Sequence, residues 1–133
     1  MNVHQLLSIS PVVPVVTIRD AHKAVPVARA LQDGGVQVIE VTLRTESSLE
    51  CIERIARELP SMTVLAGTVC HASQVRESLA AGAAGIVSPG LTESIATAVD
   101  TAGVAWLPGV ATASDIMRGL ALGLDCVTLF PAN

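Results

Sequence analysis

The sequence predicts an α/β fold in which helices pack against a buried parallel sheet, and three observations support this class. Half of the 133 residues are hydrophobic but only 2% are aromatic, a mixture that suits short branched side chains packed between helices and a sheet. Apolar runs of strand length alternate with segments of helical periodicity. Gly82, Gly103 and Gly123 recur about one strand and one helix apart, where each is expected to end a helix.

The predicted elements follow one repeated pattern. The first apolar run, "VVPVVTI" at residues 12–18, precedes a helical segment that Asp20 can cap and that Gly34 and Gly35 can end. Four further units follow: "VQVIEVTL" with "SSLECIERIAREL", "TVLAGT" with "ASQVRESLAAG", "AGIVSP" with "TESIATAVDTAG", and "VAWLPG" with "ASDIMRGLALG". A sixth run, "DCVTLF", ends the series, and a short helix is expected at residues 3–8. No linker divides the chain, so residues 1–133 are predicted to form a single domain.

Strands and helices that alternate in this way predict parallel strands joined by right-handed crossovers. Two architectures fit six such strands: an open doubly wound sheet, or the first three quarters of a (β/α)8 TIM barrel. Periodicity alone does not choose between them. Small and polar residues follow the predicted strands, and in a barrel the residues at these strand ends would meet at one rim.

Glu40 and Arg44 are the chemically richest pair at this rim. If both lie on one strand, their spacing places both side chains on the same face, toward the interior. Buried charges are costly unless they are paired, hydrogen-bonded or used on a ligand. The pair therefore predicts either a ligand site or a structural ion pair, and a third interpretation places Arg44 past the strand, near the start of the next helix.

Two other polar segments have both a structural and a functional interpretation. Thr68 follows Gly67 at a strand-to-helix junction, where it could cap the helix or contact a ligand. Ser88-Pro89-Gly90 is a common turn sequence whose backbone amides could also cradle an anion. Neither segment is specific on its own.

Several classes of protein and site are disfavoured. The net charge of −4 and the lack of a basic cluster argue against nucleic-acid binding. Pro11 and Pro14 interrupt the apolar N-terminal segment, which argues against a signal peptide or membrane span and favours a cytoplasmic protein. Three cysteines without a CxxC spacing predict neither a disulfide framework nor structural zinc. His71, beside Cys70, lacks partners at metal-ligand spacing, so no metal or other cofactor is expected.

Six strings in fixed order resemble one enzyme family: "PVVPVV", "GGVQVIEVTLRT", "LAGTV", "AAGAAGIVSPGLTE", "LPGVATASDIMRGLALG" and "LFPA". Together they are similar to the 2-keto-3-deoxy-6-phosphogluconate (KDPG) and 4-hydroxy-2-oxoglutarate (KHG) aldolases. The resemblance implies a homotrimeric TIM barrel, a class I lyase of the Entner-Doudoroff pathway. Such an enzyme cleaves the 2-keto-3-deoxy sugar acid phosphate into pyruvate and glyceraldehyde 3-phosphate, or 4-hydroxy-2-oxoglutarate into pyruvate and glyoxylate.

The resemblance also implies roles for individual residues. Glu40 in "IEVTLRT" matches the general acid/base, and Arg44 matches the residue that binds the pyruvate carboxylate. Thr68 matches a further contact to that carboxylate, while Pro89 and Phe130 would line the pocket. No cofactor is implied, because a lysine of the protein forms an imine with the substrate ketone.

Two departures from the family pattern stand out. The imine-forming lysine is expected two residues before the phenylalanine of "FPA", where this chain has Thr128, and its one lysine, Lys23, is predicted on an outer helix. The last two barrel strands and their phosphate site would follow residue 133, so the chain is interpreted as a truncated form. The sequence therefore predicts an aldolase-like protein of impaired activity, or a non-catalytic pyruvate-binding or trimeric assembly protein with the same fold. A doubly wound regulatory domain is disfavoured, because the first strand does not end in an acidic cluster.

Overall fold

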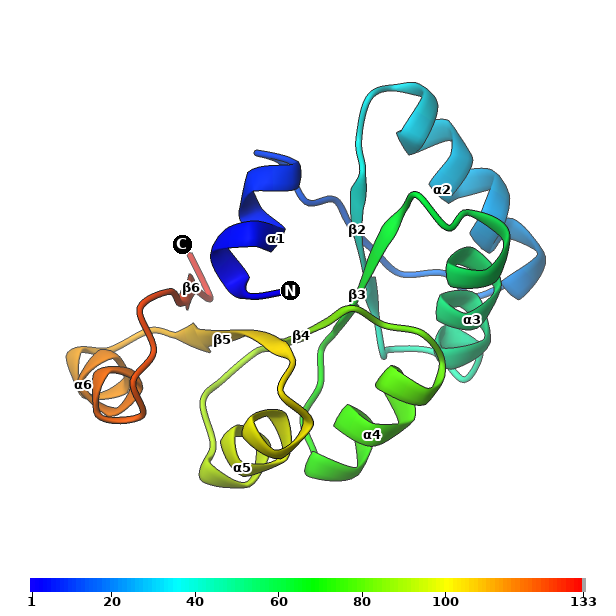
Figure 1. Cartoon of the computed structure of the whole chain (residues 1–133). Coiled ribbons are helices and arrows are strands. Elements are labelled where there is room, and N and C mark those ends of the chain that lie inside the picture. The colour runs from blue at the N-terminus through cyan, green and yellow to red at the C-terminus, as the bar shows by residue number, and fades with distance from the viewer. Residues whose placement is uncertain (133) are drawn as a thin grey trace.

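The computed structural model of the chain describes residues 1–132. Six parallel strands form one sheet in which spatial order follows chain order, and the sheet curves into a half-barrel (Figure 1). The strands are β1 (Val15–Val16), β2 (Val38–Thr42), β3 (Thr63–Gly67), β4 (Gly85–Ser88), β5 (Ala105–Val110) and β6 (Thr128–Leu129). The helices are α1 (Val3–Ile9), η1 (Ala21–Lys23), α2 (Ala24–Asp33), α3 (Ser48–Glu58), α4 (Ala72–Ala80), α5 (Glu93–Ala102) and α6 (Ala113–Ala121).

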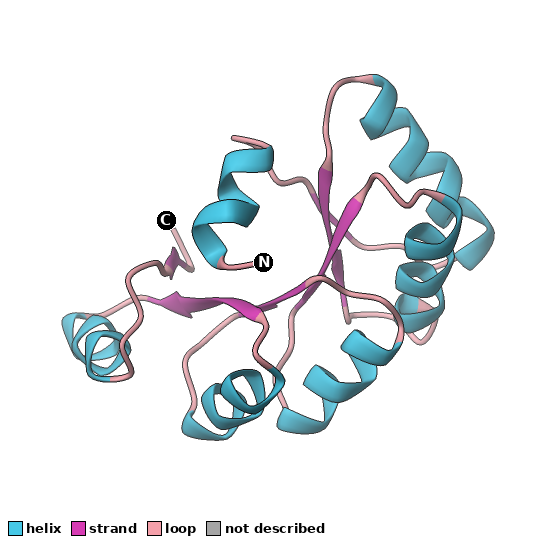
Figure 2. Cartoon of the chain, in the orientation of Figure 1, coloured by secondary structure: helices cyan, strands magenta, loops and turns pink. Residues whose placement is uncertain are grey.

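The order of the strands decides between the two predicted architectures. A doubly wound sheet reverses its direction of growth at an internal switch point. Here every strand pairs in parallel with the next one along the chain, from β1 to β6. Helices α2 to α6 lie outside the curved sheet, while α1 lies on the concave side (Figure 2). The predicted α/β fold of the barrel type is therefore confirmed, and the doubly wound alternative is wrong.

Alternation along the strands separates two apolar layers. On β2, Ile39 and Val41 point outward into the larger core cluster beneath the helices. Val38 points the other way, into a smaller cluster that α1 covers with Leu6. Glu40, two residues after Val38, lies on the same inner face, and its position is therefore set by the strand period.

The predicted helix boundaries are largely confirmed. The Asp20 carboxylate accepts a hydrogen bond from the backbone N–H of His22 at the start of η1, and Gly34 follows the last residue of α2. Gly82, Gly103 and Gly123 have φ angles of +102°, +63° and +76°, in the left-handed region that glycine adopts without steric cost. Asn2 caps α1. This helix is one residue longer than the short helix predicted at residues 3–8.

The two outer strands are much shorter than the apolar runs that predicted them. Between residues 1 and 132, β1 pairs only with β2 and β6 pairs only with β5. A strand that is paired on one side loses half of its ladder, and Pro14 has no N–H to donate. Val15 and Leu129 are 60% and 64% exposed. Both edges of the half-barrel are thus open and apolar.

Among residues 1–132, no helix combines the length and the hydropathy needed to cross a bilayer.

Candidate active site

Glu40 projects from β2 into the concave side of the half-barrel. It is aligned with Leu65 of β3, and its side chain lies against Gly67 at the end of that strand. The carboxylate is half-buried, and within residues 1–132 it has neither a hydrogen bond nor an ion pair. Burial raises the pKa of the Glu40 carboxyl above its ordinary value, and the positive charge of Arg44 opposes part of that rise. This carboxylate is thus available to a ligand.

Arg44 does not form the ion pair that one interpretation of the sequence proposed. Strand β2 ends at Thr42, so Arg44 lies in the bend that follows and the strand period no longer sets its direction. Its Nε atom donates a hydrogen bond of 3.1 Å to Thr68 Oγ1, and the residue is exposed. It makes no hydrogen bond to α3 among the described residues. The interpretation that placed Arg44 beyond the strand is correct in location. The hydrogen-bond partner of Arg44, however, is Thr68, which follows β3.

Thr68 is not a helix cap, and this expectation from the sequence is wrong. Helix α4 begins at Ala72, four residues further on, where the Gln74 side chain accepts hydrogen bonds from the backbone N–H groups of Cys70 and His71. Thr68 itself has a φ of +58°, a left-handed conformation that costs a threonine about 1 kcal/mol or more. The rim therefore holds Thr68 in a strained conformation, with its hydroxyl bonded to Arg44.

The turn after β4 is held by the core beneath it. Ser88 is buried, and its hydroxyl donates to the Gly90 carbonyl at 2.7 Å and accepts from the indole N–H of Trp106 at 2.9 Å. Pro89 is exposed at the rim, and its backbone lies against Gly109 of β5: a Cβ added to Gly109 would be 2.6 Å from the Pro89 carbonyl carbon. The Ser88 hydroxyl thus has a structural role.

Thr128 and Phe130 belong to the open edge. Thr128 is aligned with Gly109 across the β5–β6 pair, is half-buried, and has no side-chain hydrogen bond to the described part of the chain. Phe130 is 46% exposed. The predicted site residues therefore form two groups on one rim: Glu40, Arg44 and Thr68 on or just after β2 and β3, and Pro89, Thr128 and Phe130 on or just after β4 and β6. No hydrogen bond or ion pair joins these groups within residues 1–132.

Comparison with known proteins identifies the family of this chain. The family model "KDPG and KHG aldolase" matches residues 3–133, nearly the whole chain. This chain belongs to the KDPG and KHG aldolase family. Against the 2-dehydro-3-deoxy-phosphogluconate aldolase of Pseudoalteromonas atlantica, it is 46% identical over 128 residues, which make up 96% of this chain and 60% of that relative. The chain thus spans about three fifths of the length of the curated aldolases it matches.

Two solved aldolase structures show the same fold. The 2-keto-3-deoxy-6-phospho-gluconate aldolase from Zymomonas mobilis superposes with a TM-score of 0.94 at 44% identity, covering 99% of this chain and 64% of that one. The KDPG aldolase from Legionella pneumophila, with pyruvate captured at low pH as a covalent carbinolamine intermediate, gives 0.92 at 38% identity, covering 96% and 62%. The half-barrel therefore has the geometry of the corresponding part of these aldolase barrels.

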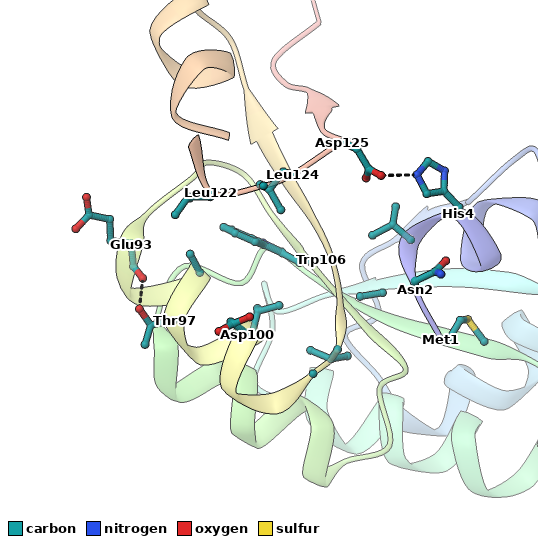
Figure 3. Close-up of a pocket in the computed structure, with 17 residues that line it drawn as sticks. Met1, Asn2, His4, Glu93, Thr97, Asp100, Trp106, Leu122, Leu124 and Asp125 are labelled. Carbon is teal, nitrogen blue, oxygen red and sulfur yellow. Dashed lines mark hydrogen bonds and ion pairs between the residues drawn. The ribbon is translucent and has the colours of Figure 1, made fainter. Parts of the chain in front are cut away.

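A cavity of about 830 Å³ lies beside Trp106, between α5 and the start of α1 (Figure 3). It is lined by α5, the start of β5, the connection from α6 to β6 and the residues at the start of α1. Trp106 lies within this lining, and His4 Nε2 is 2.8 Å from Asp125 Oδ2. The hydrogen bond from His4 lowers the pKa of Asp125. Because β5 begins here and Arg44 follows the end of β2, this cavity lies at the opposite end of the sheet from Arg44.

The structure offers no candidate metal centre in the described residues, where no three His, Cys, Asp or Glu side chains converge. His71 and Cys70 are both exposed at the start of α4. Two residues that shape the site were missed: Gly67, against which Glu40 lies, and Gly109, against which Pro89 lies. A glycine inside or at the end of a strand was the available signal, because it often marks a close approach.

Proposed function

We propose that the rim formed by Glu40, Arg44 and Thr68 binds pyruvate and related 2-keto acids and moves protons on them. The observation that carries the proposal is the Glu40 carboxyl, which is half-buried, without a partner among residues 1–132, and raised in pKa. A general acid/base works best when its pKa is close to the working pH, and a buried carboxyl approaches that condition. The carboxyl is thus suited to transferring a proton at the substrate carbon.

Arg44 and Thr68 are proposed to hold the substrate carboxylate. The guanidinium uses its Nε to bond Thr68, which leaves its terminal nitrogens for a planar, two-pronged contact with a carboxylate. A guanidinium that is already oriented loses less freedom when it binds. Pro89 and Phe130 are proposed as the walls of the pocket.

The family reaction is proposed as the parent activity: reversible aldol cleavage to pyruvate and glyceraldehyde 3-phosphate, or to pyruvate and glyoxylate. It proceeds when an amine adds to the substrate ketone and loses water, so that the resulting imine accepts the electron pair of the breaking carbon–carbon bond. A hydroxyl can add to a ketone, but it cannot go on to an imine. With Thr128 in this position the chain is proposed to bind pyruvate while its cleavage activity is impaired by a factor on the order of 10⁴ or more.

The test restores the amine. Intact mass after borohydride reduction with pyruvate is expected to show an adduct on the Thr128→Lys variant and none on the unchanged chain. A second lysine variant, Thr63→Lys, places the new amine at the start of β3 and controls for non-specific modification. An adduct on the unchanged chain would overturn the impairment, and failure of Thr128→Lys to gain an adduct would overturn the assignment of this position.

A second function is favoured by the same residue. Because Thr128 stands where an amine is needed, a non-catalytic pyruvate-binding or assembly protein fits the chain as well. This alternative predicts pyruvate binding that depends on Arg44, with no lyase activity even in Thr128→Lys. An assay of pyruvate release from KDPG by the Thr128→Lys variant separates the two functions.

The proposed assembly is a homotrimer. Light scattering would then give a mass three times the 13.7 kDa of one chain. A monomer at micromolar concentration would contradict it.

A further inference from the structure

Gly67 lies where a side chain would collide with Glu40. A Cβ built on Gly67 would be 2.6 Å from both Cγ and Cδ of Glu40, and it would also overlap Oε1. Carbon atoms in ordinary contact are about 3.5 to 4.0 Å apart, so an alanine here and the present conformation of Glu40 exclude each other. The absent side chain of Gly67 therefore forms a slot in the inner face that the carboxyl end of Glu40 occupies.

The next residue turns the chain away from this slot. Thr68 has a φ of +58° and its hydroxyl accepts the hydrogen bond from Arg44 Nε. The Glu40 carboxylate thus lies against Gly67, whereas the Arg44 guanidinium is bonded to Thr68 in the turn. No hydrogen bond or ion pair within residues 1–132 joins Glu40 to Arg44, although Arg44 is the charged group that acts on the Glu40 titration.

We propose that Gly67 is a positioning residue for the active site. Because Gly67 has no side chain, the Glu40 carboxyl can occupy the half-buried slot, where it stays out of contact with Arg44. This inference rests on the proposed function only for its catalytic consequence. The position of Glu40 itself follows from the packing on β2 and β3.

The three atoms nearest to this Cβ all belong to the flexible part of Glu40. Cγ, Cδ and Oε1 move by rotation about side-chain bonds. Gly67→Ala is therefore expected to fold and to expel the carboxyl from its slot. Outside the slot the carboxyl is better solvated or approaches Arg44, and both changes lower its pKa toward or below the ordinary value.

The direct experiment follows the side-chain carboxyl carbon of Glu40 by ¹³C NMR through a pH titration of the whole chain. Glu40→Gln identifies the signal. Gly119→Ala is the matched control: Gly119 is buried on α6, and a Cβ there would meet Leu91 Cδ1 at 3.5 Å, an ordinary contact that involves neither β2 nor β3. The Glu40 pKa is expected to fall in Gly67→Ala and to stay unchanged in Gly119→Ala. An unchanged pKa in Gly67→Ala, or an equal fall in both variants, would overturn the proposal.

A kinetic measurement adds the catalytic consequence in the Thr128→Lys background. Gly67→Ala is expected to lower kcat at least tenfold and to move the acidic limb of the pH profile, with KM changed less than about threefold, because Arg44 and Thr68 still hold the carboxylate. A loss confined to KM would contradict a role through Glu40. If Thr128→Lys is itself inactive, the proposed function fails while the NMR titration still decides the role of Gly67.

Discussion

The Nε atom of Arg44 lies 3.1 Å from Oγ1 of Thr68, although the two residues are 24 positions apart in the chain. This hydrogen bond ties the bend after β2 to the left-handed turn after β3. It fixes the Nε edge of the guanidinium, and within residues 1–132 no ion pair joins Arg44 to Glu40. The bond is thus the best-defined feature of the candidate carboxylate site.

Thr68→Val tests this bond, because valine keeps the branched shape but removes the acceptor. Pyruvate affinity is expected to fall about 2- to 10-fold, the equivalent of one hydrogen bond of roughly 0.5–1.5 kcal/mol. Titration followed on the pyruvate methyl signal measures it. Thr101→Val, which removes a hydroxyl bonded to the Thr97 carbonyl on α5, should leave affinity unchanged. Equal affinities for Thr68→Val and the unchanged chain would argue against the assigned role.

Glu40→Gln tests the cost of the buried charge. The pKa of Glu40 is raised in the folded chain, so the folded state binds the proton more tightly than the unfolded state does. The stabilisation by protonation is therefore present below the ordinary pKa and is lost as the pH rises through the raised value. Glutamine stays neutral throughout, so its Tm should exceed that of the unchanged chain at about pH 8 and approach it near pH 4.

Glu46→Gln is the control for this pH dependence, because Glu46 is an exposed glutamate in the following loop. Its Tm difference from the unchanged chain should vary less with pH. A Glu40→Gln variant that is less stable at pH 8 would show that the ionised carboxylate stabilises the fold.

Ser88→Ala tests the support beneath the Pro89 turn. The indole N–H of Trp106 would lose its acceptor inside the core, and an unsatisfied buried donor costs about 1–3 kcal/mol. Chemical unfolding followed by the fluorescence of this tryptophan, the only one in the chain, measures the loss. Ser73→Ala, at an exposed position on α4, should cost less than about 0.5 kcal/mol. Similar losses in both variants would mean that the Ser88 bond contributes little.

Val15→Lys tests association through the open edge of β1. A lysine on an edge strand discourages pairing with another chain, so the average mass in sedimentation should fall. Met117→Lys adds the same charge on the exposed face of α6, where Met117 is 69% exposed. If Met117→Lys lowers the mass more than Val15→Lys does, the helix face and not the strand edge carries the association.

The sequence predicted the repeating elements well because their signals are local. Apolar runs, helical periodicity and the glycines that end helices depend on neighbouring residues. The edge strands were overestimated because the length of a strand depends on partners on both sides. Thr68 was misjudged as a possible cap because the local pattern of a strand end followed by a helix does not reveal a left-handed turn between them.

The sequence by itself determined the α/β class, the family resemblance, and the placement of Glu40 on the inner face of its strand. Only the tertiary structure decided how the charges are arranged. Strand β2 ends at Thr42, so Arg44 leaves the strand period and bonds Thr68, while Gly67 makes room for Glu40. These contacts join residues about 24 to 27 positions apart, and such distances are set by strand register and not by local sequence.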